Sequence, residues 1–194
     1  MSHAEGVNVK RRRVLIASTA AIGAVGVGAI ATPFVRSWYP SAKAEAAGAA
    51  VVADIAGIEN GQMITLKYRG KPIFVVKRTE DMLANLSKVT PRLADPESNG
   101  SVQPENCKNE TRSIQPEILV VEGVCTHLGC APIFRPEVGA ADLGGADWMG
   151  GFFCPCHGSM YDLAGRVYSS MPAPLNLPVP IYKIEDTILT VGEA

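Results

Sequence analysis

Two short segments constrain this chain more than any other feature, because each places a thiolate and an imidazole within three positions of each other. They are Cys125-Thr126-His127-Leu128-Gly129-Cys130 and Cys154-Pro155-Cys156-His157-Gly158-Ser159. Glycine and proline beside these side chains permit tight turns. Two such turns that face each other present two sulfur and two nitrogen ligands, so the sequence predicts a metal centre.

Structural zinc also accepts two Cys and two His, but its usual spacing puts both Cys on one turn and both His on the other. Here each turn gives one of each, which suits a two-iron cluster with two thiolates on one iron and two imidazoles on the other. Cys130 and Cys156 occupy matching places beside the ligands, and a disulfide between them would tie the turns together. Zinc and a site that uses all six side chains remain the alternatives.

A run of 22 residues without charge, Val14 to Val35, follows the basic cluster Lys10-Arg11-Arg12-Arg13. A helix of this length spans about 33 Å, enough for a hydrocarbon core of about 30 Å. The basic flank places the N-terminus in the cytoplasm, and the Arg pair resembles a twin-arginine export signal. A cleaved signal peptide is the alternative, since Ala42-Lys43-Ala44 offers a cleavage site, but its apolar core is usually only about 7–15 residues.

The remaining chain reads as an all-β head. The whole chain has a net charge of −1, which argues against nucleic-acid binding. Strands are predicted at Val51–Ile55, Met63–Tyr68, Ile73–Val76, Ile118–Val121, Gly151–Phe153, Arg166–Tyr168 and Thr187–Val191, with Lys71-Pro72 between the second and third. One helix is predicted over Glu80–Leu86, capped by Thr79. We expect a basic segment at 1–13, an anchor at 14–35, a flexible tether at 36–50 and the head at 51–194.

The segments 125–130 and 154–159, called here the first and second box, resemble the two cluster-binding motifs of the Rieske iron–sulfur protein of cytochrome bc1 complexes. The resemblance implies an antiparallel β-sandwich with a small inserted cluster-binding subdomain at about 123–175, holding one [2Fe–2S] cluster. It implies that Cys125 and Cys154 bind one iron, that His127 and His157 bind the other, and that Cys130 and Cys156 form a disulfide.

Further residues acquire roles from the same resemblance. The Ser159 hydroxyl should bond a bridging sulfide, and the Tyr161 hydroxyl should bond a ligand cysteine sulfur. Met171-Pro172-Ala173-Pro174 resembles the loop over the cluster, usually Gly-Pro-Ala-Pro, so Met171 replaces a glycine. Leu128, at the tip of its turn, is expected either to line the surface that meets the quinol or merely to shield the cluster from water.

The function implied is electron transfer in a bacterial quinol:cytochrome c oxidoreductase of the inner membrane, with a periplasmic head. Cytochrome b, cytochrome c1 and ubiquinol are the expected partners, in a complex expected to be dimeric. His157 or His127 would accept the quinol's proton, and the head would swing on residues 36–50. Replacing two thiolates by imidazoles shifts such clusters from about −400 mV to about −150 to +300 mV.

Three other classes of Rieske protein are alternatives to a bc1 subunit. An aromatic-ring oxygenase needs a second iron held by two His and a carboxylate, but the chain has 3 His in all, so only His3 remains. Rieske subunits of cytochrome b6f or arsenite oxidase remain alternatives; Asn176-Leu177 fits the bc1 pattern better.

Two features fall outside the motif. Cys107, in the polar segment 90–117, is expected to be a free, exposed thiol. Residues 135–151, between the boxes, are expected to be a surface insertion, either a passive loop or a contact for a partner subunit.

Overall fold

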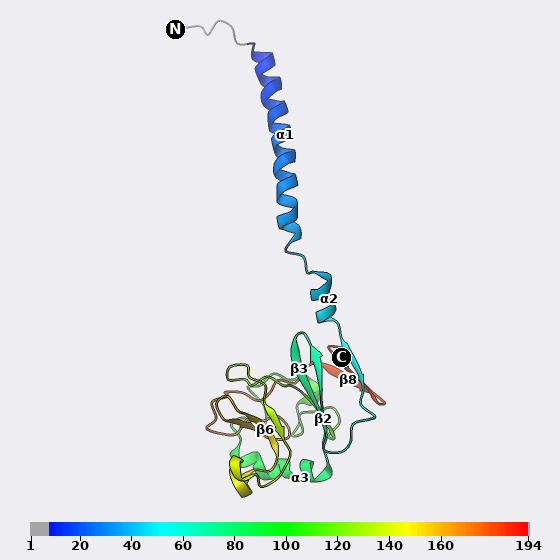
Figure 1. Ribbon diagram of the computed structural model, residues 1–194, viewed down its shortest axis with the longest axis vertical. Coiled ribbons are helices and arrows are strands. Elements are labelled where there is room, and N and C mark those ends of the chain that lie inside the picture. Colours follow the sequence, from blue (N-terminus) through cyan, green and yellow to red (C-terminus); the bar gives the residue numbers. More distant parts are fainter. Residues whose placement is uncertain (1–7, 194) are drawn as a thin grey trace. The chain divides into compact units, whose positions relative to one another are not determined.

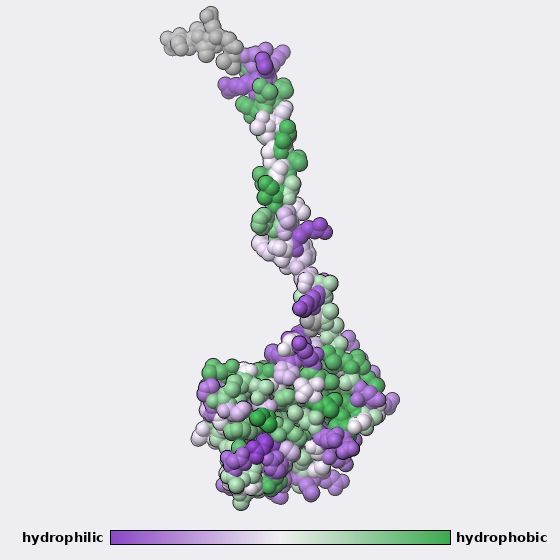
Figure 2. Space-filling view, in the orientation of Figure 1, coloured by the Kyte–Doolittle hydropathy of each residue, from purple (hydrophilic) through white to green (hydrophobic). Residues whose placement is uncertain are grey.

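The protein, a computed structural model that describes residues 8–193, divides into two compact units with the boundary between Ala46 and Ala47 (Figure 1). In the first unit, α1 spans Val9–Arg36 and Asn8 caps it by accepting the Arg11 N–H at 3.1 Å. The helix is longer than the predicted span because it takes in the basic cluster, which Figure 2 shows in purple beside the apolar stretch. Residues 1–7 of the predicted cytoplasmic segment lie outside the described residues.

The α1 helix has the length and composition of a membrane span, with a mean hydropathy of 2.1 over its best window and none of that window buried. Because its apolar side chains are exposed throughout, they are free to meet lipid. A second helix, α2 (Ala42–Gly48), lies within the segment predicted as a tether and contains Ala42-Lys43-Ala44.

Over the described residues 51–193, the head has nine strands in three antiparallel sheets of three, which confirms the all-β expectation. The sheets have the orders β1-β9-β8, β2-β3-β4 and β5-β6-β7. The strands are β1 (Val51–Asp54), β2 (Met63–Tyr68), β3 (Lys71–Lys77), β4 (Ile118–Glu122), β5 (Ile133–Arg135), β6 (Gly151–Cys154), β7 (Ser159–Tyr161), β8 (Tyr182–Glu185) and β9 (Ile188–Val191). Strands β5, β7 and β8 were not predicted; β5 and β7 have only three residues each, too few to show a period.

The middle strand β3 carries the continuous apolar run Ile73–Val76, and all four of these residues are buried. A run without polar alternation is typical of a strand covered on both faces. Its neighbour β4 buries Ile118–Val121 in the same way, and both strands join one core with residues of the other two sheets, such as Phe152 and Leu189.

Two details of the predicted strands were wrong. Lys71 and Pro72 belong to β3, and the hairpin turns at Arg69-Gly70, where both φ angles are positive (48° and 79°). That two-residue turn suits hairpins but is usually signalled by Asn-Gly or Asp-Gly, so Arg69 hid it. Residues 166–168 make only isolated bridges, Tyr161 with Val167 and Leu93 with Tyr168, and form no strand.

The predicted helix is α3 (Glu80–Val89), which runs three residues beyond Leu86 and is capped by Thr79 through the Met82 N–H at 3.2 Å. Short 3-10 turns follow at Thr90–Arg92 and Glu105–Cys107. The second turn carries Cys107 into the core, where it is free but 0% exposed, so the expectation of an exposed thiol was wrong. Polar neighbours in sequence misled here, because free Cys behaves as a small hydrophobic residue.

The insertion is also more than a passive surface loop. It folds into 3-10 turns at Ala141–Leu143 and Gly145–Asp147 and buries the Trp148 side chain, which is 1% exposed. Trp148 joins a small second core with residues such as Leu93 and Tyr168.

Candidate metal centre

The two boxes form turns of the same construction. In the first, which follows β4, the Gly129 N–H donates to the Cys125 carbonyl at 3.0 Å. In the second, which joins β6 to β7, the Gly158 N–H donates to the Cys154 carbonyl at 2.9 Å. Both glycines have left-handed φ angles, 87° and 77°, which disfavour other residues. The matching sequence spacing therefore produces matching backbone geometry.

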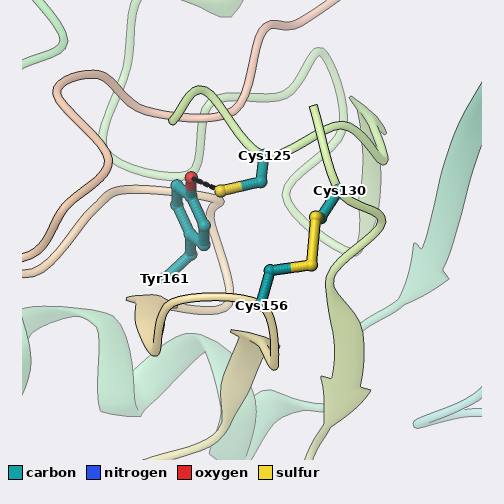
Figure 3. Close-up of a disulfide and its surroundings, with 4 residues drawn as sticks. All are labelled: Cys125, Cys130, Cys156 and Tyr161. Carbon is teal, nitrogen blue, oxygen red and sulfur yellow. Dashed lines mark hydrogen bonds between the residues drawn. A yellow bond between two sulfur atoms is a disulfide. The ribbon is translucent and has the colours of Figure 1, made fainter. Parts of the chain in front are cut away.

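A disulfide between Cys130 and Cys156 joins the two turns, as the resemblance implied (Figure 3). These sulfurs lie with the Cys154 sulfur in a group whose members are all within 4.8 Å of one another. Since Cys130 and Cys156 are bonded to each other, they are not metal ligands, and the six-ligand alternative fails. The disulfide fixes the separation of two loops whose boxes are far apart along the chain.

The donors that remain fit a cluster with two sulfur and two nitrogen ligands. Cys125 and Cys154 are free and buried, 3% and 1% exposed. The rings of His127 and His157 meet edge to face, with centroids 4.7 Å apart. Within the described residues, His127 Nδ1 is buried without a hydrogen-bond partner. A buried polar atom is normally paired, so an unpaired imidazole nitrogen of this kind is what a metal ligand presents.

The Tyr161 hydroxyl contacts one of those sulfurs, as the resemblance implied. Its oxygen lies 3.2 Å from Cys125 Sγ and accepts the Thr126 N–H at 3.2 Å (Figure 3). Burial raises the pKa of Tyr161 above its ordinary range, so the hydroxyl keeps its proton. Burial alone would raise the pKa of Cys125 as well, but hydrogen bonding, above all by Tyr161, outweighs it and lowers that pKa. The contact therefore favours a thiolate at Cys125.

The Ser159 hydroxyl is fully buried and accepts the Ala173 N–H at 3.1 Å. This bond ties the loop Met171–Pro174 to the end of the β6–β7 hairpin and leaves the Ser159 proton free to donate elsewhere. The Met171 side chain is partly buried against both cores. Met171 stands where the family usually has glycine, but its φ is not left-handed, so its side chain causes no backbone strain. The left-handed φ in this segment belongs to Ser170 (62°).

A buried ion pair follows Tyr161 directly and closes a turn behind it. Arg166 Nε donates to Asp162 Oδ2 at 2.7 Å, and both side chains are 1% exposed. Arg78 and Arg112 donate to the carbonyls of Leu163 and Ala164, at 2.9 and 3.1 Å. Desolvation lowers the pKa of each of these two arginines to about 10. The turn at 162–166, which directly follows Tyr161, is thus held to the rest of the head by several hydrogen bonds.

The predicted site residues divide by exposure. The two cysteines, Ser159 and Tyr161 are buried together, whereas Leu128 is 72% exposed and His157 and Pro172 are also exposed. Thr126 was overlooked: its hydroxyl donates to the Leu175 carbonyl at 2.6 Å, which links the first box to the proline loop. Its position between the expected ligands Cys125 and His127 could have indicated a role in the site.

Comparisons with known proteins agree with this geometry. The family described as "Ubiquitinol-cytochrome C reductase Fe-S subunit TAT signal" matches residues 1–41, and "Rieske [2Fe-2S] domain" matches residues 48–183. The chain is 56% identical to the ubiquinol-cytochrome c reductase iron-sulfur subunit of Allochromatium vinosum, over 98% of this chain and 92% of that one. It is 43% identical to the subunit of the same name in Rhodospirillum rubrum, over 96% of this chain and 94% of that one.

Among solved structures, a chain of "Hyperthermophilic respiratory Complex III" is 26% identical with a TM-score of 0.48, over 89% of this chain and 96% of that chain.

Proposed function

Because the chain belongs to the iron–sulfur subunits of ubiquinol–cytochrome c reductase, with a Rieske [2Fe–2S] domain as its head, we propose how its own residues carry out electron transfer there. The observation that supports the proposal is the donor set of two buried free thiols beside two imidazoles. Cys125 and Cys154 would hold one iron, and His127 and His157 would hold the other.

When bound, a cluster with this ligand set supplies one-electron chemistry at about −150 to +300 mV. The chain's residues adjust that chemistry from outside the ligand set. Tyr161 would donate to the Cys125 sulfur, which lies 3.2 Å from its oxygen, and the Ser159 hydroxyl, which accepts the Ala173 N–H, would donate its free proton to the cluster. Hydrogen bonds to sulfur stabilise added negative charge, so both raise the potential.

The exposed His157 is the better placed of the two histidines to meet a quinol, since His127 is partly buried. Either imidazole would accept the quinol's proton on the nitrogen that faces away from the site, while the electron enters the head. Leu128 and Pro172, both exposed beside the box turns, would line the surface that contacts cytochrome b. Cytochrome c1 would then receive the electron.

The chain has a helix that anchors it to a membrane and a twin-arginine signal. We infer that the N-terminus stays in the cytoplasm of a bacterium, on the side of the Arg11–Arg13 cluster, and that the head is periplasmic. Residues 36–50 would let the head move between partners, and the boundary between the two compact units falls inside them. The assembled complex would be a dimer.

The test is an EPR-monitored redox titration of the purified complex at several pH values. A coupled proton makes the midpoint potential fall by about 59 mV per pH unit above the pH at which coupling begins. His157→Ala and His127→Ala should each abolish the signal, whereas replacement of Cys107, the free cysteine outside the site, should preserve it. A signal that survives either histidine replacement would remove that residue from the ligand set.

A further inference from the structure

The insertion closes on itself before it contacts the rest of the head. The Gly139 N–H donates to the Trp148 carbonyl at 2.8 Å, which pins the base of the loop. Between these two residues, Leu143 is 6% exposed and turns inward. The Trp148 ring is therefore presented from a closed loop rather than from a loose one.

That ring rests on the segment that leads into the proline loop. Trp148 stacks on Tyr168 with ring centroids 6.1 Å apart, and the Arg92 guanidinium lies over the same Tyr168 ring, 5.4 Å from its centroid. Arg92 Nη1 also donates to the Asp147 carbonyl, and its own carbonyl accepts the Ser169 N–H at 2.8 Å. The insertion and the start of the proline loop thus share one arginine and one aromatic stack.

Met171 is the side chain that carries this support further along the loop. Among residues 169–172, which the structure describes, Ser169, Ser170 and Pro172 are exposed and only Met171 is partly buried. It packs against the small core that contains Trp148 and Tyr168 and against the main core. Two residues later, Ala173 donates its N–H to the Ser159 hydroxyl at 3.1 Å.

We propose that Trp148 is a positioning residue for the metal centre, which acts through Met171 to hold the proline loop and, through the Ala173 N–H, the orientation of the Ser159 hydroxyl. The insertion is then a brace. While the Ser159 oxygen accepts the Ala173 N–H, the hydroxyl cannot rotate freely, and its proton stays directed toward the metal centre. A loosened loop would free that hydroxyl to rotate. The redox part of this inference rests on the proposed ligand set, but the mechanical part does not.

The test compares Trp148→Leu and Met171→Gly in the intact complex by amide hydrogen exchange of residues 169–174 and by the midpoint potential. Each variant should accelerate exchange in this segment roughly tenfold and lower the potential. The double variant should add little to either single change, because both break one path. Met171→Leu, which restores an apolar side chain, should behave like the wild type.

Leu189→Ala is the matched control, because Leu189 is a fully buried residue of β9 in the main core and outside the small core. It should lower the unfolding midpoint without changing exchange at 169–174. If Trp148→Leu lowers the unfolding midpoint but leaves both exchange and potential unchanged, Trp148 is only structural and the brace is wrong. If Trp148→Leu does not fold, Met171→Gly decides by the same readouts. A wild-type protein without an EPR signal would instead refute the ligand set and leave the exchange result standing.

Discussion

Replacing Tyr161 by Phe isolates one hydrogen bond to the metal centre. The ring is 0% exposed and would keep its packing, while the oxygen 3.2 Å from Cys125 Sγ is lost. A hydrogen bond to a charged acceptor contributes about 1.5–3 kcal/mol. Since the sulfur is negative in both redox states, only part of this, about 1 kcal/mol, should separate them. With 1.4 kcal/mol equal to about 59 mV for one electron, the midpoint potential should fall by about 40 mV.

In the wild type the Thr126 N–H donates to the Tyr161 hydroxyl at 3.2 Å, so the same replacement removes the acceptor of that N–H. A buried donor left unpaired costs about 1–3 kcal/mol, so the head should also lose stability. Redox titration and chemical denaturation therefore measure two separate consequences of one lost oxygen. Quinol oxidation should slow along with the fall in potential, because the driving force for the electron is smaller.

The fold supplies a matched control in Tyr182→Phe. The Tyr182 hydroxyl accepts the Ile114 N–H at 2.9 Å and lies 3.7 Å from the sulfur of Cys107, which is not an expected ligand. This variant should lose comparable stability and leave the potential unchanged. An unchanged potential in Tyr161→Phe, or an equal fall in Tyr182→Phe, would refute the assignment of Tyr161 as a tuning residue.

Three further outcomes are expected. Replacing both Cys130 and Cys156 by Ser removes a crosslink between residues 26 apart and should lower the unfolding free energy by about 3.5 kcal/mol, measured by denaturant titration. Cys107 should react with a thiol reagent at pH 8 only as fast as the head unfolds, because it is 0% exposed and burial raises its pKa; rapid labelling of folded protein would contradict its burial. Burial raises the pKa of Tyr168 from 10.0 to about 12, so its contribution to stability is present below pH 10 and lost as the pH rises toward 12. Tyr168→Phe should therefore lose less stability than the wild type between pH 10 and 12 in denaturant titrations.

The parts of the fold that could be predicted are those with a strong local signal. The run Ile73–Val76 is long enough and apolar enough to identify a buried strand, and Thr79 identifies the start of α3. By contrast, β5 and β7 have three residues each, too few to show a period, and both form by pairing with β6. Short strands of this kind are specified by the strand with which they pair rather than by their own sequence.

The site shows the same division. The Cys and His spacing predicted which donors exist, because ligand chemistry restricts those positions to few residue types. It could not show that Cys107 is buried, since that depends on how the polar segment 90–117 folds back onto β8. Nor could it show that Trp148 and Met171 meet one small core, because neither residue carries chemistry of its own.

Two tyrosines in this head make almost the same set of contacts, and the difference between them locates the function. Tyr161 and Tyr182 are both buried, both accept a backbone N–H and both contact a cysteine sulfur. Cys107 is not an expected iron ligand, so its contact with Tyr182 should contribute to the stability of the fold alone. Around Cys125 the same contact acts on a sulfur that we propose as an iron ligand, so the Tyr161 hydroxyl proton would influence electron transfer.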